Sequence, residues 1–216
     1  MKILVFDTET TGLPTERNAS IVSTDKWPYI VQLSYILYDT TDNIVQDYSD
    51  NIIKLPENVQ ISAESENIHK ISKEISETKG IDIKKALVEF NKAILDADLL
   101  VAHNISFDKR VIMVECIRNK IKQNFTINKR RKPEFCTMKN SIDLCKIVTY
   151  DKEGKEYYKY PKLVELYKHL FNTIPEGLHN SMIDILACLR CYGKIKHNVD
   201  YFEISTTFKM LNNIYR

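Results

Sequence analysis

The chain has 216 residues, of which 44% are apolar and 28% are charged, and its formal net charge is +2 at pH 7. These values are ordinary for a soluble globular protein and allow one sizeable domain with a hydrophobic core. Glycine occurs only five times, and neither G-x-x-x-x-G-K nor G-x-G-x-x-G is present, so glycine-rich phosphate-binding loops are nearly excluded. No apolar stretch reaches the length of a signal peptide or membrane span, so we expect a soluble, intracellular protein, either cytoplasmic or nuclear.

The first half of the chain predicts an antiparallel start to a sheet. Lys2–Thr8 is nearly continuous in apolar residues, which is typical of a strand buried on both faces. After a loop at 14–28, two further strands are predicted at Ile30–Asp39 and Ile44–Ile53, joined by a tight turn. Two helices are predicted next, at Ser65–Thr78 and Ile83–Leu95.

The second half alternates short strands with helices. Asp98–His103 predicts a strand, and Ser106 is a candidate N-cap for a helix that runs to about Asn119. Glu134–Thr137 predicts a short fifth strand. The last clear helices are predicted at Leu163–Phe171 and Ser181–Lys196. We find no internal repeat and no linker, so one α/β domain over residues 1–216 is expected.

The cysteines indicate free thiols. Their odd number, five, and their irregular spacing argue against a disulfide framework. Cys188 and Cys191 have the spacing of a redox motif, but they lie within an apolar helical pattern, and no second pair completes a zinc site.

Positive charge gathers in one region. Residues 109–146 contain 11 Lys or Arg and 3 Asp or Glu, which leaves 20 basic and 26 acidic residues in the remainder. The densest run is Lys129-Arg-Arg-Lys132. Two interpretations stay open, a solvated loop and a patch that contacts phosphates.

Asp7 and Glu9 stand at the end of the first predicted strand. Side chains two residues apart on a strand share a face, so both carboxylates can reach one metal ion. None of the next four residues is basic, and paired carboxylates without a counter-charge repel each other. The alternative is a structural role, such as a cap or a salt bridge. We favour a cation that is supplied from outside.

Two further carboxylates begin predicted helices. Asp108 falls in the first turn of the helix after the fourth strand, where it could simply complement the helix dipole. Asp184 lies three residues after Ser181, a spacing that also suits ordinary helix capping. Asp184 nevertheless lies on the apolar face of its helix, where a carboxylate usually needs a partner. His179 precedes it in a loop and could fold back beside it.

Taken together and in this order, the motifs resemble one family. The chain contains D-x-E-T-T-G-L at Asp7–Leu13, H-N-x-x-F-D at His103–Asp108 and H-x-x-x-x-D at His179–Asp184. This is similar to the pattern of the DEDDh-type (DnaQ-like) 3′–5′ exonucleases, the family of the proofreading subunit of bacterial DNA polymerases. Supporting stretches are "IVQLSYILYD", "IHKIS", "FCTMK" and "YPKLVELYKHLF", so the resemblance spans about residues 2–195.

The resemblance implies a fold and a chemistry. The expected fold is a ribonuclease H-like α/β/α sandwich with a mixed five-stranded sheet. It implies two Mg²⁺ ions, for which Mn²⁺ could substitute, and hydrolysis of a phosphodiester to a nucleoside 5′-monophosphate. The four acidic ligands would be Asp7, Glu9, Asp108 and Asp184, and His179 would be the general base.

The resemblance also implies substrate contacts. Leu13 would wedge against the terminal base, in a pocket for the 3′-terminal nucleotide. The expected contacts are Thr8, Thr10, Thr11, Gly12, Leu13, His69, Asn104 and Phe107. The loop 14–28 and the basic insertion 120–133 are departures from the simplest members of the family.

Three functions follow as expectations. The first is a 3′–5′ exonuclease that prefers DNA and could serve a separate DNA polymerase; no oligomeric state is indicated. The second is the same chemistry on RNA. The third is a catalytically silent module that binds nucleic acid or a polymerase, which the complete set of four acids and His179 argues against.

Overall fold

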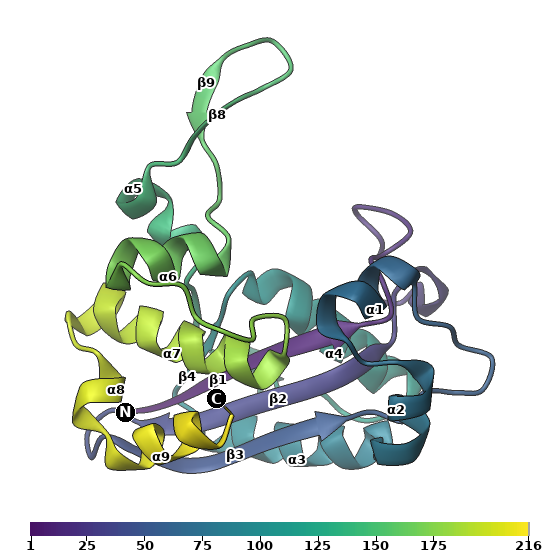
Figure 1. The fold of residues 1–216 in the computed structure, drawn as a ribbon. Coiled ribbons are helices and arrows are strands. Elements are labelled where there is room, and N and C mark those ends of the chain that lie inside the picture. The colour runs from purple at the N-terminus through teal and green to yellow at the C-terminus, as the bar shows by residue number, and fades with distance from the viewer. Residues whose placement is uncertain (216) are drawn as a thin grey trace.

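A computed structural model describes residues 1–215, and its centre is a mixed five-stranded sheet (Figure 1). The strands lie in the order β3-β2-β1-β4-β7. β1 pairs antiparallel with β2 and parallel with β4, and β7 is parallel to β4. The predicted antiparallel start and the fifth strand are both confirmed. The bounds are Lys2–Thr10 for β1, Ile30–Asp39 for β2, Ile44–Ile52 for β3, Leu99–Ala102 for β4 and Glu134–Cys136 for β7.

Helices cover both faces of this sheet, because alternate side chains of β1 are apolar on both sides. Leu4 and Phe6 pack in one core with α3 (Ile83–Asp96) and α4 (Ile105–Arg118). Ile3 and Val5 pack in a second core with α7 (Ser181–His197) and α9 (Thr206–Ile214). The α/β/α sandwich is therefore as predicted, with the central strand buried on both faces.

The helices that follow β3 were predicted less well. The single helix predicted at Ser65–Thr78 is wrong: α1 (Ala63–His69) ends at Lys70 in a left-handed conformation, with φ of 61°, and α2 (Lys73–Lys79) begins after the Ser72 cap. Because Ser72 accepts a hydrogen bond from the Ile75 N–H, the chain starts a new helix there instead of continuing the old one.

Two helix starts also differ from the prediction. Asn104, and not Ser106, is the N-cap of α4, with φ of 67°, and Ser106 is exposed two residues further on. Asn180, and not Ser181, caps α7, and its side chain accepts from the N–H groups of Met182 and Ile183. Ser181 is buried instead and forms a short hydroxyl contact with Ser34.

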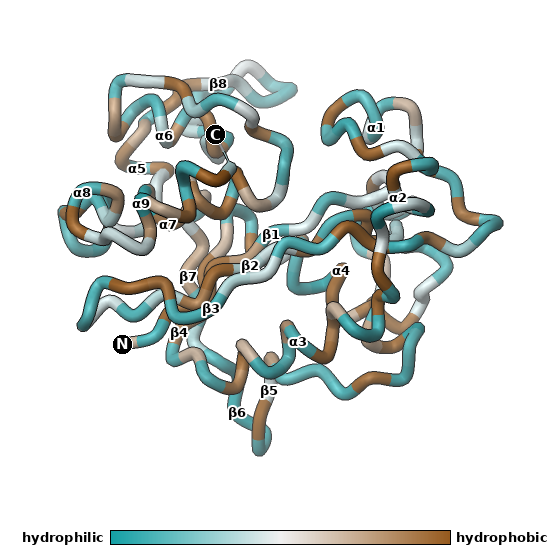
Figure 2. The backbone as a smooth tube through the Cα atoms, turned by 60° about the horizontal axis from the view of Figure 1, so that its bottom comes forward, coloured by the Kyte–Doolittle hydropathy of each residue, from teal (hydrophilic) through white to brown (hydrophobic). Residues whose placement is uncertain are grey.

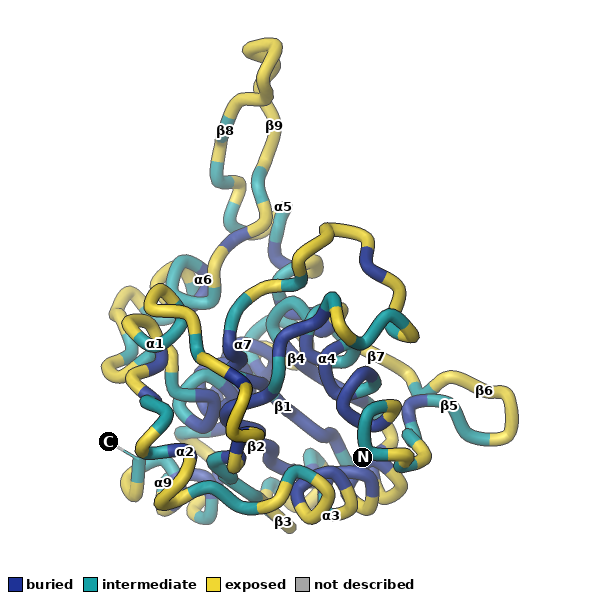
Figure 3. Tube along the Cα trace, turned by 90° about the vertical axis from the view of Figure 1, so that its right-hand side faces the viewer, coloured by how far each residue is buried: buried dark blue, intermediate teal, exposed yellow. Residues whose placement is uncertain are grey.

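Several short elements were not predicted. Two small hairpins leave the body of the molecule, β5–β6 (Thr126–Ile127 and Arg130–Arg131) and β8–β9 (Val148–Tyr150 and Glu156–Tyr158). Figure 2 shows the first beside α3, and Figure 3 shows the second as an exposed arm. The other short elements are η1 (Thr24–Lys26), η2 (Lys139–Ser141), α5 (Ile142–Cys145) and α8 (Tyr201–Ile204). In contrast, α6 (Leu163–Phe171) has the predicted bounds.

The five thiols are free, and Cys188 and Cys191 are buried in α7 as predicted. Among residues 1–215, no helix is long and apolar enough to cross a membrane.

Candidate active site

Three carboxylates meet where β1 faces the start of α7. Asp7 and Glu9 follow Ile3 and Val5 in the strand alternation, so they project toward the α7 side of the sheet. Asp184 lies in the first turn of α7. One oxygen of each of the three carboxylates lies within 4.8 Å of the others. The structure therefore brings together three of the four predicted metal ligands.

Asp108 approaches the same strand from the opposite layer. It lies in the first turn of α4, and its Oδ1 accepts hydrogen bonds from the N–H of Thr8 at 3.1 Å and from the Thr8 hydroxyl at 2.9 Å. Thr8 was predicted to contact substrate, but its side chain is buried and holds Asp108 in place. Asp108 remains close enough for its charge to raise the pKa of Asp7.

The electrostatics of this cluster are those of carboxylates without a counter-charge. Burial, and then the charges of Asp108, Asp184 and Glu9, hold the pKa of Asp7 well above its usual range. Burial and the charges of Asp184 and Asp108 raise the pKa of Glu9 to about 8. Burial raises the pKa values of Asp108 and Asp184 to about 7, against the hydrogen bonds that each accepts.

His179 lies beside this cluster through its backbone. Its N–H donates to both carboxylate oxygens of Asp184, at 3.3 Å each, and its φ of 74° turns the loop toward α7. The residue is exposed, and within residues 1–215 its ring makes no hydrogen bond. The imidazole is therefore free to meet a water or a substrate at the same edge.

A pocket of about 630 Å³ opens next to Glu9. It is lined by seven of the eight predicted substrate contacts, namely Thr8, Thr10, Thr11, Gly12, Leu13, His69 and Phe107. The eighth, Asn104, is not part of the lining and caps α4 instead. Leu13 is 80% exposed at the pocket, an unusual position for a leucine in a loop that follows a buried strand.

The threonine hydroxyls of this segment shape the pocket wall. The Thr10 hydroxyl donates to the Gly12 carbonyl at 2.7 Å, and the Thr11 hydroxyl accepts from the Tyr29 N–H at 3.0 Å. These bonds fold the segment after β1 into a compact turn whose outer rim is Leu13.

His69 contributes a buried donor to the pocket. Its Nδ1 accepts from the Ile71 N–H at 3.0 Å, so the proton of the neutral ring is on Nε2. Within residues 1–215, Nε2 makes no hydrogen bond of good geometry, although the Thr10 carbonyl lies close enough to favour the protonated ring. Burial is the stronger influence and lowers the pKa of His69, so the ring is neutral at pH 7.

Sequence reasoning missed the contribution of the loop 14–28. This loop folds back on the pocket and adds Thr15, Lys26, Trp27 and Pro28 to its lining. Trp27 is buried, its Nε1 donates to the Ser20 carbonyl at 3.0 Å, and Arg110 lies over its ring at 5.2 Å. The chain's single tryptophan, Trp27, lies in this loop. Its position was the sequence signal that could have indicated a role for the loop.

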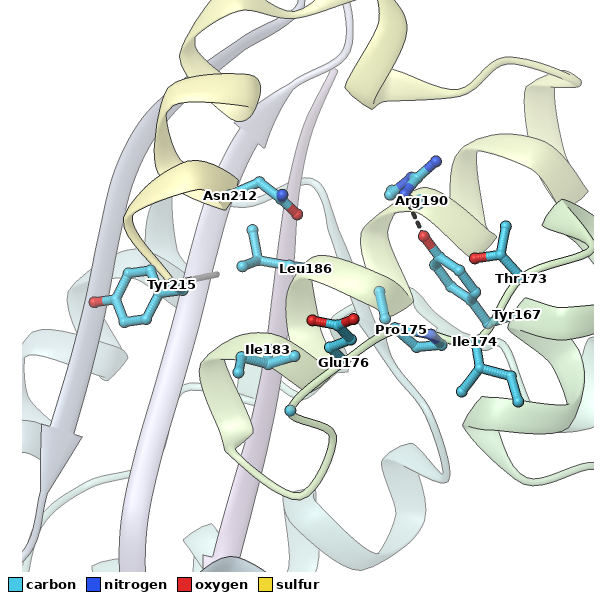
Figure 4. A pocket seen from close by; sticks show the side chains of 12 residues that line it. Tyr167, Thr173, Ile174, Pro175, Glu176, Ile183, Leu186, Arg190, Asn212 and Tyr215 are labelled. Atoms are coloured by element: carbon cyan, nitrogen blue, oxygen red, sulfur yellow. Dashed lines mark hydrogen bonds between the residues drawn. The ribbon is translucent and has the colours of Figure 1, made fainter.

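A second cavity, of about 620 Å³, lies behind the loop that precedes His179 (Figure 4). Figure 4 shows its floor on α7, at Ile183 and Leu186, and the loop residues Pro175 and Glu176 across it. Gly177 also borders it. None of the predicted catalytic residues lines this cavity.

The basic run lies at the other end of the sheet. Lys129–Lys132 immediately precede β7, whose start pairs with Leu100 near the start of β4. Because β1 and β4 are parallel, their starts lie opposite the end that carries Asp7 and Glu9. The Lys132 Nζ binds the carbonyls of Leu95 and Ala97 at the end of α3. This arrangement favours a solvated hairpin over a phosphate patch of the carboxylate site.

Comparison with known proteins agrees with this geometry. The model of the Exonuclease family (RNase_T) matches residues 4–192. The chain belongs to this exonuclease family. The matched range contains the whole expected catalytic set, namely Asp7, Glu9, Asp108, His179 and Asp184.

Solved structures of Escherichia coli exonuclease I share the fold of this exonuclease-family chain, which is ribonuclease H-like. One exonuclease I structure is 13% identical, with a TM-score of 0.68, and covers 99% of this chain and 43% of its own. A complex with a dT13 oligonucleotide is 14% identical, with a TM-score of 0.65, and covers 89% and 41%. The chain thus spans less than half the length of these structures. A search of the curated proteins finds no match.

Proposed function

We propose that this chain is a metal-dependent 3′–5′ exonuclease of the DEDDh type that removes nucleoside 5′-monophosphates from DNA 3′ ends. The observation that carries the proposal is the cluster of Asp7, Glu9 and Asp184, whose oxygens lie within 4.8 Å of one another and whose pKa values are all raised. Half-buried like charges at this spacing call for a cation, and the exonuclease family uses divalent metals.

The donor set fits Mg²⁺. All of the ligand atoms are carboxylate oxygens, which hard cations such as Mg²⁺ and Mn²⁺ prefer, and the cluster contains neither histidine nor thiolate. Asp7, Glu9 and Asp184 would hold two ions together with Asp108. When bound, such ions lower the pKa of a water and neutralise charge on the scissile phosphate.

The protein's own groups supply positioning and proton transfer. Asp184 is oriented by the His179 N–H, and Asp108 by Thr8. His179 is the general base that takes the proton of the attacking water, a role that suits an imidazole. Its exposed ring can turn toward the phosphate, because no hydrogen bond within the described chain holds it elsewhere.

The pocket supports a frayed or single-stranded 3′ end as substrate. The 3′-terminal nucleotide enters beside Glu9, Leu13 wedges against its base, and the Nε2–H of His69 donates to its sugar or phosphate. A paired end must first leave its partner strand, which costs a few kcal/mol. A mismatched end has already lost part of this pairing, so the activity suits proofreading or repair beside a separate DNA polymerase.

DNA is the favoured polymer and RNA is the second candidate. Exonuclease I structures with this fold hold dT13 and dA16 oligonucleotides, which supports DNA. Discrimination between the sugars depends on what meets the 2′ position, and the same metal chemistry serves both.

The test compares matched 20-nucleotide DNA and RNA strands, and blunt and 3′-mismatched DNA duplexes, with Mg²⁺ present. We expect nucleoside 5′-monophosphates as products, faster loss of DNA than of RNA, and faster loss of mismatched than of blunt ends. Faster loss of RNA would assign the exoribonuclease activity instead, and binding without any hydrolysis would assign a silent module.

A further inference from the structure

The β8–β9 hairpin is an arm that leaves the body of the molecule. We call residues 146–160 the tyrosine arm, because they hold four of the chain's 12 tyrosines. Figures 1 and 3 show it projecting beyond α5 and α6, with an exposed tip. Its two strands pair Val148 with Tyr158 and Tyr150 with Glu156. The Lys159 Nζ at its base binds Oε1 of Glu165 on α6 at 2.6 Å, but a two-stranded ribbon is at best marginally stable alone, so its aromatic content is unexplained by folding.

The tyrosines lie open on the arm. Tyr150 is 63% exposed and Tyr160 54%, and Tyr157 and Tyr158 are exposed as well. The register places Tyr150 and Tyr158 on one face of the ribbon and Tyr157 on the other. Within residues 1–215, none of these rings stacks on another ring or on a cation, and none of their hydroxyls forms a hydrogen bond.

The root of the arm is tied to the catalytic end of the sheet. His103 directly follows β4 and precedes the helix that carries Asp108. Its Nε2 lies 3.1 Å from the carbonyl of Pro161, the residue directly after the arm, and its Nδ1 lies 3.0 Å from the Thr137 hydroxyl. Burial lowers the pKa of His103 to about 4, so this link is made by a neutral ring at pH 7.

We propose that the tyrosine arm stacks the bases of the single strand whose 3′ end lies in the carboxylate site. The inference rests on the proposed function and deepens it. Exposed aromatic rings bind single strands by stacking, which tolerates any sequence because every base has a π face. The arm would hold nucleotides upstream of the scissile bond and keep the strand attached between successive cleavages.

A nucleic-acid strand fits the arm better than a protein partner does. The arm is a narrow ribbon with four lysines and three acidic residues, and its only exposed aliphatic side chain is Val148. A stable protein interface needs about 800 Å² per partner with a dry apolar centre, which this surface does not supply. The near balance of charge also predicts that the arm contributes affinity by stacking and not by phosphate contacts.

The test compares two double variants. One removes two tyrosine rings from one face of the arm, and the matched control retains both rings. Tyr150→Ala/Tyr158→Ala removes the rings, and Tyr150→Phe/Tyr158→Phe retains them without the hydroxyls. Binding of a labelled 20-nucleotide dT strand in EDTA is measured by fluorescence anisotropy at 50 and 200 mM salt. Hydrolysis of the dinucleotide dTpdT with Mg²⁺ reports the carboxylate site alone, because this substrate is too short to occupy both the site and the arm.

We expect the alanine pair to weaken binding of the 20-nucleotide strand by at least about fivefold, the low end for loss of one base–ring stack. The phenylalanine pair should bind like the wild type, all three proteins should hydrolyse dTpdT equally, and the salt dependence should not change. Equal affinity of the alanine and phenylalanine pairs, with dTpdT hydrolysis intact, would overturn the role of the arm alone. A wild type that hydrolyses neither dTpdT nor the 20-nucleotide strand would instead overturn the proposed function.

A second variant controls for local misfolding of the ribbon. Residues 147–159 are replaced by a short Gly–Ser linker, which removes both faces of the arm and leaves Pro161 and its bond to His103 in place. We expect the same loss of affinity for the long strand and unchanged dTpdT hydrolysis. If linker replacement leaves affinity intact but changes the sedimentation of the protein, the arm is a contact between copies of the chain and the proposal fails.

Discussion

At the scale of single residues, the site depends on carboxylates that the fold forces together. Asp7 and Glu9 share a face because they are two apart on a strand, and this much was predictable from the sequence. In the fold, Asp184 joins them, whereas Asp108 is held through Thr8. This difference was not predictable from the sequence, because it depends on which layer each helix occupies. The resemblance predicted a role for all four residues, and the fold shows their different positions.

The raised pKa values make stability depend on pH when no metal is bound. Glu9, Asp108 and Asp184 keep their protons up to about pH 7–8 in the folded chain, whereas ordinary values are 4.5 for Glu and 3.8 for Asp. The folded state therefore binds more protons, and the free energy of unfolding falls as pH rises from about 4 to about 8. We expect thermal unfolding in EDTA to show this fall, and Mg²⁺ at pH 8 to reverse it.

Asp184→Asn tests whether the carboxylate cluster causes this pH dependence of stability. Removing one charge relieves repulsion, so the variant should be as stable as the wild type or more stable at pH 8 without metal, and its stability should change less between pH 5 and pH 8. An undiminished pH dependence in the variant would attribute the effect to other groups.

His179→Ala tests the proton transfer. We expect turnover to fall by about 10²–10⁴, the usual contribution of a positioned general base, while Mn²⁺ binding stays close to that of the wild type. His169→Ala is the matched control, because His169 is exposed on α6 outside the site. Near wild-type turnover of His179→Ala at neutral pH would make His179 a structural residue.

At the scale of elements, periodic segments were predictable and irregular ones were not. The long strands and α3, α6 and α7 follow continuous apolar patterns, so their positions were predicted closely. The break between α1 and α2 depends on the left-handed Lys70, and the hairpins contain strands of only two or three residues. Such short pieces are set by tertiary contacts and local turns, which leave little periodicity to read.

The loop that carries His179 depends on a glycine. Gly177 has φ of 73°, and an added Cβ would lie 2.6 Å from Cδ1 of Ile183. Gly177→Ala should therefore shift the loop and lower kcat, with a loss of stability of about 1 kcal/mol. Gly154→Ala is the control, with kcat of both variants measured on dTpdT, since Gly154 has a similar φ of 80° in the turn of the arm and open space around it. Equal kcat values for the two variants would show that the conformation of this loop does not contribute to catalysis.

The basic hairpin is expected to be neutral toward substrate. Lys129, Arg130 and Arg131 are exposed at the end of the sheet opposite the carboxylates. Replacing all three by alanine should leave the salt dependence of binding to a four-nucleotide strand unchanged, whereas each lost phosphate contact would reduce its slope by about 0.7. A reduced slope would restore the phosphate-patch interpretation.

At the scale of the whole molecule, the parts to which we assign function gather at one end of the sheet. The carboxylates, the His179 loop and the pocket rimmed by Leu13 all lie where β1 ends, and the root of the tyrosine arm is tied to the end of the parallel β4. The basic hairpin lies at the opposite end. The account therefore expects a strand to approach from one side only, with its 3′ end at Asp7.

The most direct test of the metal site follows the digestion of a 5′-labelled single-stranded DNA by the wild type, Asp7→Asn and Asp42→Asn. Asp42→Asn is the control, because Asp42 lies in the remote turn between β2 and β3. With Mg²⁺, the wild type and Asp42→Asn should give a ladder that shortens one nucleotide at a time from the 3′ end, and EDTA should stop it. Asp7→Asn should be folded and inactive. A metal-dependent ladder from Asp7→Asn would contradict the account.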